Sequence, residues 1–488
     1  MYRPIIILCI LLAGCAVGPD FQRPAAPNVD RYTPQPLAVQ TASVEVKGGD
    51  TQRFVQEMDI PGQWWTLFQS KPLNDLIDQA LKANPDMKAA QAALHVAWEN
   101  VYAQQGAFFP SVEAVFNPTR QKTAGVLTSP LQSNSYTYSL HTAQVSVAYA
   151  PDVFGGMRRQ VESLKAQADS QRFQLEATYL TLTSNVVAAA VQEAALRGQI
   201  EATKKMIEFQ VKSLELLKRQ YELGQVATAD VAAQEAALAQ TQAMLPPLEK
   251  QLAQQRDLLA RLIGRFPSEG LVEEFELSSL QLPQELPVSL PSRLVEQRPD
   301  VRSAEEQLHS ASADIGVSIA NRLPNINLSA NWGSSATAIN QLFTSGTGFW
   351  GLAGNLTQPI FQGGTLLHRQ RAAEAAYDQA AAQYRSVVLT AFQNVADTLH
   401  AIESDSDALK AAVASERAAA KSLSIARSQL ELGAISYLAL LNAEQTYQQA
   451  MVNLVQAIAN RYADTVALFQ ALGGGWWNRS DVPSGVGE

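Results

Sequence analysis

The feature that most constrains this chain of 488 residues is an internal duplication. Residues 84–86 (Asn-Pro-Asp) recur as residues 298–300 (Arg-Pro-Asp), and residues 221–224 (Tyr-Glu-Leu-Gly) recur as residues 430–433 (Leu-Glu-Leu-Gly). Six such short matches occur in the same order, at offsets between 208 and 214 residues. One match of this length arises easily by chance, but six in order do not. The chain is therefore predicted to contain two copies of one structural unit.

Each copy is predicted to fold as helix, strand, loop, strand, long helix, tight turn and helix. Apolar and aromatic residues recur in steps of four and three from 175 to 221 and from 377 to 402, a period that favours left-handed supercoiling against neighbouring helices. Both long helices end at a Leu-Gly pair, and glycine suits the left-handed residue after a helix. At about 67 residues, each would be roughly 100 Å long. The flanking helices are about half as long, and Pro246-Pro247 is expected to break or kink one of them.

Between these helices, short segments alternate between apolar and polar residues, as half-buried strands do. Residues 325–332 and 350–356 form one such pair, and residues 112–116 and 136–149 form another. A shift of the apolar phase within the segment 136–149 predicts a β-bulge or an exit from the sheet. Alternation with terminal aromatics is typical of a transmembrane β-barrel, whereas a sheet resting on a soluble core, or a soluble coiled-coil rod, is the alternative. The aromatics expected at the membrane interfaces are Tyr136, Tyr138, Trp332 and Trp350.

Four strands cannot close into a barrel, and an open sheet edge is not tolerated in hydrocarbon. Other copies of the chain must therefore complete the sheet. Two copies would supply eight strands, a size whose interior is largely filled by side chains, while three would supply twelve. A homotrimer is thus the smallest assembly expected to enclose a channel.

The N-terminus has the form of a secretory signal, with Arg3 followed by apolar residues 5–12 and small residues before Cys15. Residues 12–15 (Leu-Ala-Gly-Cys) resemble the lipobox of bacterial lipoproteins, in which the cysteine becomes the lipidated first residue. Ala16, in place of an aspartate retention signal, favours the outer membrane by the same resemblance. An ordinary signal peptide that leaves a spare thiol is the alternative. Either cleavage removes Cys9, so no disulfide framework or cysteine zinc site is expected.

Composition and motifs argue against catalysis and against nucleic-acid binding. The formal net charge is −9, whereas proteins that bind nucleic acids carry basic patches. The five histidines are isolated in the sequence, and a metal site needs converging ligands at short spacings. The P-loop pattern GxxxxGK[ST] and the nucleophile pattern GxSxG are absent from the sequence, and neighbouring acids are expected to be solvated helix faces. We therefore expect no enzyme activity, no metal site, no cofactor and no nucleic-acid partner.

The sequence resembles the outer membrane factor family, the TolC-like channel-tunnels, and most closely their lipid-anchored OprM-like (NodT) efflux branch. The resemblance covers residues 15 to 477. It implies a mainly α fold with a small β part: a long-helix coiled-coil α-barrel, a transmembrane β-barrel of twelve strands in the trimer, and an equatorial belt. The motifs that carry it are residues 14–21 (Gly-Cys-Ala-Val-Gly-Pro-Asp-Phe), 23–24 (Arg-Pro), 64–65 (Trp-Trp), 298–300 (Arg-Pro-Asp), 361–364 (Phe-Gln-Gly-Gly) and 471–476 (Ala-Leu-Gly-Gly-Gly-Trp).

The duplication and the resemblance together predict the organisation of the chain. The expected segments are a signal peptide (1–14), a lipidated and equatorial segment (15–69), repeat 1 (70–264, with a β-hairpin at about 111–150), an equatorial connector (265–291), repeat 2 (292–473, with a β-hairpin at about 325–358) and a tail (474–488).

By resemblance, the chain is the exit duct of a tripartite pump for small molecules such as drugs. Its partners would be a periplasmic adaptor (membrane fusion) protein, an inner-membrane resistance-nodulation-division transporter and outer membrane lipid. An exit duct for one-step (type I) protein secretion is the first alternative. An envelope spacer without a pore is the second, although it leaves the alternating strands unexplained.

The two turns between helices are expected to form the tips that dock the adaptor. A turn exposed in a monomer would favour polar residues, so an exposed apolar residue such as Val226 or Ile435 suggests a partner site. Packing of the turns inside the trimer is the alternative. The predicted docking residues are Gly224, Gln225, Val226, Gly433, Ala434 and Ile435.

In the resembling family, acidic residues just past the turns line a periplasmic constriction, tied by tyrosine and arginine. Here Asn442 stands where the OprM-like pattern usually has Asp, and Ile435 stands where TolC-like tips have a linking Arg. Three symmetry-related carboxylates would repel one another, which Asn avoids. We therefore expect an uncharged gate formed by Leu438, Leu441 and Asn442. Asp230 matches the acidic position and is either a gate contact or a helix-start residue favoured by the dipole.

Overall fold

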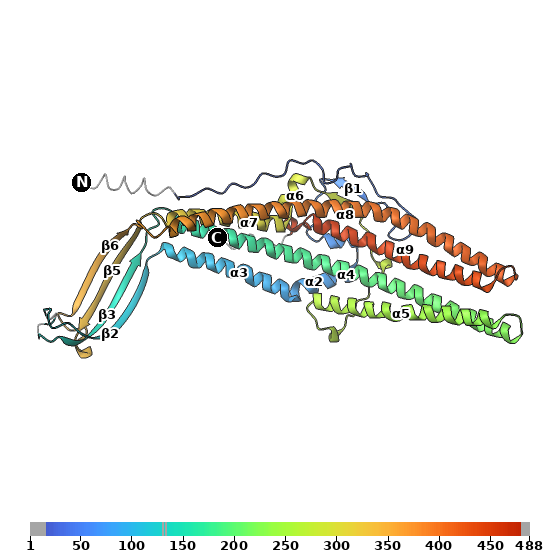
Figure 1. Cartoon of the computed structure of the whole chain (residues 1–488), viewed down its shortest axis with the longest axis horizontal. Helices are drawn as coiled ribbons and strands as arrows, with labels where there is room; N and C mark the ends of the chain where they lie inside the picture. The colour runs from blue at the N-terminus through green and yellow to red at the C-terminus, as the bar shows by residue number, and fades with distance from the viewer. Residues whose placement is uncertain (1–15, 129–130, 132–133, 480–488) are drawn as a thin grey trace. The chain divides into compact units, whose positions relative to one another are not determined.

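The computed structural model describes residues 16–128, 131 and 134–479 (Figure 1). The predicted signal peptide and Cys15, and most of the predicted tail, lie outside the described residues. The strands are β1 (Arg53–Gln56), β2 (Ser111–Lys122), β3 (Thr137–Tyr149), β4 (Glu285–Val288), β5 (Asn325–Ala336) and β6 (Gly348–Thr357). The helices are α2 (Lys71–Ala83), α3 (Pro85–Gln105), α4 (Gly156–Glu222), α5 (Thr228–Leu262), α6 (Pro291–Gln297), α7 (Pro299–Ala320), α8 (Thr365–Glu431) and α9 (Tyr437–Ala471).

The duplication predicted from the sequence is visible in matched helix lengths. Helices α4 and α8 each have 67 residues, and α5 and α9 each have 35. Short turns join α4 to α5, the first hairpin, and α8 to α9, the second hairpin (Figure 1). The mainly helical fold with a small β part is confirmed.

The two long helices end in the same backbone motif. Gly224 and Gly433 adopt φ values of +70° and +68°, in the left-handed region that glycine tolerates best. The amide of Gly224 donates to the carbonyl of Tyr221, and the amide of Gln225 donates to the carbonyl of Gln220, both at 2.9 Å. Corresponding bonds close the second turn. This Schellman arrangement satisfies carbonyls that the helix end would leave unpaired, as the Leu-Gly pairs predict.

Helix α5 continues through Pro246 and Pro247, so of the break or kink predicted there, the break does not occur. A proline inside a helix removes one N–H donor and strains the preceding turn. Two adjacent prolines affect overlapping turns, and only the carbonyls of Gln242 and Ala243 lose their usual donors. The helical bonds on both sides are sufficient to carry the helix through this point.

Four strands form an antiparallel sheet in the order β2-β3-β5-β6. The ladder between β2 and β3 runs without interruption from Ser111↔Ala148 to Lys122↔Thr137. The predicted bulge in β3, or exit of β3 from the sheet, is therefore wrong. The apolar side chains lie on one face of β3 in its first part and on the other face in its second part. The backbone of the strand stays regular throughout.

Directly paired residues of neighbouring strands point to the same side of a sheet. The paired rows on one side of this sheet are mainly apolar. One row across the sheet consists of Ala114, Val145, Trp332 and Trp350. The opposite face carries polar residues such as Asn331. The alternation predicted for the strands is confirmed. Exposed large side chains on the apolar face are Val112, Phe116, Val145, Leu328, Trp332, Trp350, Leu352 and Leu356.

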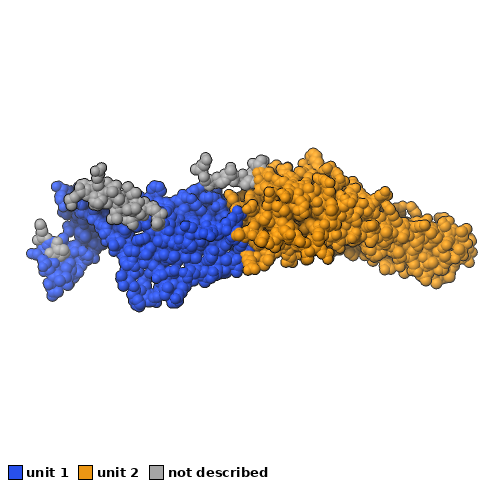
Figure 2. Space-filling view, turned by 90° about the horizontal axis from the view of Figure 1, so that it is seen from above, with its two compact units in different colours: residues 1–24, 93–171, 304–384 blue, residues 25–92, 172–303, 385–488 orange. Residues whose placement is uncertain are grey.

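The chain divides into two compact units (Figure 2). Unit 1 comprises residues up to 24, 93–171 and 304–384, and unit 2 comprises the remainder. Unit 1 contains the four-stranded sheet, while unit 2 contains both hairpin turns and the two-stranded parallel sheet β1-β4. Each unit draws on both sequence copies. Among the residues that the structure describes, no helix combines the length and apolar character needed to cross a bilayer.

Aromatic side chains form much of the core of unit 2. Trp64 is fully buried and stacks on Phe469, with ring centroids 5.2 Å apart. Its neighbour Trp65 packs against Tyr179 of α4 at 6.1 Å. Phe68 and Tyr462 meet beside them at 6.3 Å. The Trp-Trp motif therefore joins the N-terminal segment to both α4 and α9.

A buried arginine joins the N-terminal segment to α9. Arg461 is 1% exposed and donates hydrogen bonds to the carbonyls of Gly48 and Asp50, at 2.9 and 3.0 Å. It also donates to Thr41 Oγ1 at 3.3 Å and to Gln52 Oε1 at 3.0 Å. Burial lowers the pKa of Arg461, and the charge of Asp50 opposes that effect. Four acceptors from one segment thus converge on one guanidinium.

Replacing Arg461 by Met should loosen this segment. The substitution leaves several buried acceptors without donors, at about 1–3 kcal/mol for each group. We expect a lower midpoint of thermal unfolding, measured by circular dichroism, and faster proteolysis within residues 41–52. Arg417→Met is the matched control, because Arg417 is exposed and, among the described residues, donates to the carbonyl of Glu45 at 3.2 Å. Equal stability of the two variants would contradict the role assigned to Arg461.

Candidate functional site

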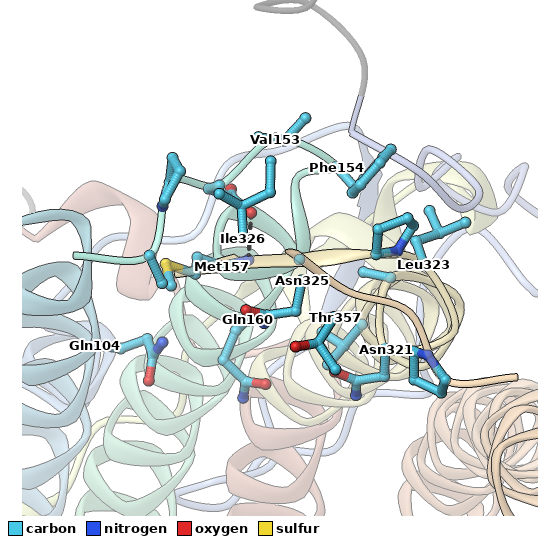
Figure 3. Close-up of a pocket in the computed structure, with 18 residues that line it drawn as sticks. Gln104, Val153, Phe154, Met157, Gln160, Asn321, Leu323, Asn325, Ile326 and Thr357 are labelled. Carbon is cyan, nitrogen blue, oxygen red and sulfur yellow. Dashed lines mark hydrogen bonds between the residues drawn. The ribbon is translucent and has the colours of Figure 1, made fainter. Parts of the chain in front are cut away.

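A cavity with a mixed polar and apolar lining lies in unit 1 between the sheet and the adjoining helix ends (Figure 3). Its volume is about 400 Å³. The close-up shows the side chains of Gln104, Gln160 and Asn321 on one side of β5, with Val153 and Phe154 on the other. These carboxamides are neutral hydrogen-bonding groups, and none of them can serve as a general acid or base at neutral pH.

The charged residue at this cavity, Asp152, has a structural role. Its carboxylate accepts hydrogen bonds from the backbone amides of Met157 and Arg158, both at 3.0 Å, and from Arg158 Nε at 3.2 Å. A carboxylate at the start of α4 satisfies free N–H groups and interacts favourably with the helix dipole. Among the described residues, no group of three or more His, Cys, Asp or Glu side chains could hold a metal ion.

The sheet brings two of the four predicted interface aromatics together. Trp332 and Trp350 are directly paired on neighbouring strands and are 69% and 74% exposed. Tyr138 lies on the opposite face, by the alternation of β3, and contacts the amide of Gln121. Tyr136 precedes β3 and is 36% exposed. Of the four predicted interface aromatics, Trp332 and Trp350 are therefore the two that lie side by side on the apolar face.

The first described residues are held firmly against unit 1. Arg159 of α4 donates to the carbonyl of Val17 at 3.1 Å and pairs with Asp20 at 2.7 Å. Phe21 stacks on His309 of α7, with ring centroids 4.3 Å apart. The hydrogen bond to Glu306 raises the pKa of His309, against the opposing effect of burial. The segment that follows Cys15 is thus anchored through both charge and stacking.

The two hairpin turns expose a matched pair of leucines. Leu223 is 72% exposed and Leu432 is 83% exposed, immediately before Gly224 and Gly433. These leucines occupy equivalent positions in the two sequence copies. In the sequence they mark only the ends of the long helices, although an apolar residue next to a left-handed glycine is a visible signal. Each turn therefore ends in an apolar side chain that its own chain does not cover.

Val226 and Ile435 do not project from the turns as predicted. Both are partly buried and pack against an apolar core formed where the hairpins meet. That core includes Leu217, Leu423 and Leu441. An apolar residue after the left-handed glycine turns back toward the helices, where burial is favourable. Gln225 and Ala434 are exposed, as expected of residues at a turn.

The predicted gate residues separate into two environments. Leu438 is 61% exposed and Asn442 is also exposed, one helical turn apart on the same face of α9. Leu441 is 5% exposed and belongs to the core between the hairpins. Leu441 therefore cannot line a lumen in this conformation, because its side chain points into its own protomer. Its contribution to a constriction can only be indirect.

Asp230 occupies the first turn of α5, where it completes half of a capping box. Its carboxylate accepts a hydrogen bond from the amide of Ala227 at 3.2 Å. The amide of Asp230 in turn donates to the carbonyl of Ala227 at 3.0 Å. This geometry, with the favourable interaction of an anion with the helix N-terminus, supports the helix-start interpretation.

One buried acid near the turns was not singled out from the sequence. Glu444 of α9 is fully buried, and neither carboxylate oxygen has a hydrogen-bond partner. Burial raises the pKa of Glu444 to about 7, while the Arg427 guanidinium and the Gln210 amide act in the opposite direction. Glu444 lies between Asn442 and Gln445, both exposed, in a polar stretch of sequence. That context gives no sign of burial.

Comparison with known proteins identifies the family. The outer membrane efflux protein model matches residues 76–265 and 290–474, once in each sequence copy. The pyoverdine export outer membrane protein OpmQ of Pseudomonas aeruginosa is 31% identical over 422 residues, covering 85% of this chain and 87% of OpmQ. The probable efflux pump outer membrane protein TtgC of Pseudomonas putida is 27% identical, covering 98% and 96%.

A solved structure agrees with this assignment. The outer-membrane channel OprN superposes with a TM-score of 0.82 at 26% identity, covering 95% of this chain and all of that chain. The superposed part covers nearly the whole fold described above. The resemblance inferred from the sequence is therefore confirmed. The chain belongs to the outer membrane efflux protein family and is located in the outer membrane.

Proposed function

We propose that three copies of this chain form a channel that serves as the exit duct of a tripartite efflux pump for small molecules. The observation that carries the proposal is the four-stranded sheet. Its apolar face is exposed, and its edge strands β2 and β6 have no partner within the described part of the chain. In hydrocarbon those edges must pair with other strands. Three copies would provide twelve strands, which leaves room for a lumen.

The pump assignment rests on family membership and on the matched relatives. The relatives are named for pyoverdine export and as an efflux pump component. Such a duct needs a periplasmic adaptor and an inner-membrane transporter, of the resistance-nodulation-division class by analogy. The cavity in unit 1 is lined by neutral side chains apart from Asp152, whose carboxylate is used to cap α4, and this is compatible with passage of solutes rather than with chemistry on them.

The adaptor would bind at the hairpin turns. Leu223 and Leu432 provide exposed apolar contacts there, and exposed apolar groups that recur in matched positions are typical of partner sites. The docking surface would comprise these leucines with Gly224, Gln225, Gly433 and Ala434. Val226 and Ile435 would support it from the core side.

The constriction near the turns would be uncharged. Leu438 and Asn442 share one exposed face of α9, and Leu441 supports them from the core between the hairpins. Closure would then depend on packing and weak hydrogen bonds rather than on ion pairs. Asp230 would stabilise the start of α5 instead of closing the gate.

Purified protein should be trimeric and should conduct. We expect native mass spectrometry in detergent to report three copies, and planar bilayers to show stepwise currents. Because Leu438 and Asn442 carry no charge, the closed state should not open sharply as salt rises or as pH falls through the carboxylate range. A non-conducting monomer would contradict the channel. Sharp opening in salt or acid would contradict the uncharged gate.

Charge at the turns should block docking. Leu223→Asp with Leu432→Asp should weaken adaptor binding about thirtyfold, equivalent to about 2 kcal/mol for a lost hot spot. The measurement is site-specific crosslinking to the adaptor, with trimer assembly followed in parallel. Val272→Asp is the control, because Val272 is 89% exposed and lies far along the chain from both turns. Undiminished crosslinking of the double variant, or of Gly224→Glu with Gly433→Glu, would exclude these turns as the docking surface.

The lipid on Cys15 should not be the only membrane anchor. Each buried CH₂ of an acyl chain contributes about 0.8 kcal/mol, but the apolar face of the sheet provides a separate attachment. Cys15→Ala protein, exported with a different cleavable signal, should still fractionate with outer membranes. Recovery of that variant entirely from the periplasmic fraction would show that the sheet does not enter the membrane.

A further inference from the structure

The core where the two hairpins meet contains an unusual group of polar side chains. Glu444 and Gln234 are fully buried, and Gln210 is 1% exposed. Both oxygens of Glu444, the side-chain carbonyl oxygens of the two glutamines and the hydroxyl of Tyr437 have no hydrogen-bond partner. Gln234 Nε2 donates to the backbone carbonyl of residue 210 at 3.1 Å, which joins α5 to α4 at this level. The group thus contains an excess of acceptors and a shortage of donors.

An ionised Glu444 makes that shortage worse. A buried carboxylate without hydrogen bonds is costly, and proteins commonly respond by keeping the group neutral. A neutral carboxyl supplies an additional O–H donor, and the side-chain carbonyl of Gln210, whose side chain faces Glu444, is an acceptor without a partner. Protonation would therefore allow a hydrogen bond between α9 and α4.

The charged groups around Glu444 do not replace this proton. From α8, the guanidinium of Arg427 acts on Glu444 electrostatically, but it is held over the ring of Phe209 at 3.7 Å and makes no ion pair with the carboxylate. From α9, Tyr437 has its pKa raised by burial and by the charges of Glu444 and Asp230. The groups from α4 and α5 are the neutral amides of Gln210 and Gln234.

We propose that Glu444 acts as a proton-controlled clasp between the two hairpins. In its neutral form it holds α9 against α4 beside the turns. In its ionised form it loosens their packing, so that the turn-proximal ends of the hairpins separate more readily. The clasp lies on the same stretch of α9 as Leu438 and Asn442, so it would regulate the gate if the proposed channel function holds. The clasp itself requires only the fold described here.

The direction of the pH effect follows from linkage. The pKa of Glu444 is about 7 in the packed state, against an ordinary value near 4.5 when the side chain is solvated. The packed state therefore holds the proton more tightly and is favoured at low pH. As pH rises from 6 to 8, the ratio of open to packed hairpin ends should increase about tenfold. This direction is opposite to that of an ion-pair gate, which opens in acid.

The test is hydrogen–deuterium exchange of the purified full-length protein at pH 6 and pH 8, comparing wild type with Glu444→Gln at each pH. The comparison cancels the intrinsic pH dependence of exchange and the titration of other groups such as Asp464 of α9, whose pKa burial raises to about 7. For peptides covering residues 205–215 and 437–448, we compare the ratio of the wild-type exchange rate to the Glu444→Gln exchange rate. This ratio should be about tenfold higher at pH 8 than at pH 6.

Two further variants make the result decisive. Glu235→Gln removes an exposed carboxylate of α5, which pairs with Lys218 at 2.7 Å, and should leave the pH dependence of wild type unchanged. Glu444→Met provides a second uncharged side chain of similar length if Gln alters the packing. A wild-type to Glu444→Gln ratio that stays the same at both pH values, or a Glu235→Gln protein that loses the pH dependence, would overturn the clasp. Protection is measured whether or not the protein conducts, so failure of the channel proposal is a separate outcome.

Discussion

The unpaired edges of the four-stranded sheet are the constraint on which the account of this protein depends. Strands β2 and β6 each use one side for pairing within the sheet. Their outer N–H and C=O groups need partners wherever water is excluded. The exposed row that includes Trp332 and Trp350 indicates that water is excluded on that face of the sheet. In the proposed channel, both requirements are met by pairing with strands of other copies.

Duplication explains how one chain supplies two equivalent hairpins. Helices α4 and α8 have the same length, and the same Schellman bonds form at Gly224 and Gly433. Both copies therefore end their long helix in the same way. The copies differ where their environments differ. Asp230 caps the first hairpin, whereas the equivalent end of the second contributes Tyr437 to the buried core. The buried Glu444 and the exposed Leu438 both lie on α9.

Much of this architecture could be predicted from the sequence, because helix length and strand alternation are local properties. The periodicity of α4 and the alternation of β5 can be recognised directly in the order of their residues. The bulge predicted in β3 failed because a change of polarity along a strand looks the same whether the backbone or the environment changes. The burial of Glu444 was missed for a related reason. Helices packed on several sides have no single apolar stripe, so periodicity does not say which polar residue lies inside.

The most direct test of the central claim is a cryo-electron microscopy map of the full-length protein in lipid nanodiscs. The account predicts a closed ring in which β2 of one copy pairs with β6 of the next, with Trp332 and Trp350 facing lipid. The same map would locate both hairpin turns of every copy at the end of the assembly remote from the lipid. A particle in which β2 and β6 remain unpaired, or in which Trp332 and Trp350 face an aqueous lumen, would contradict it.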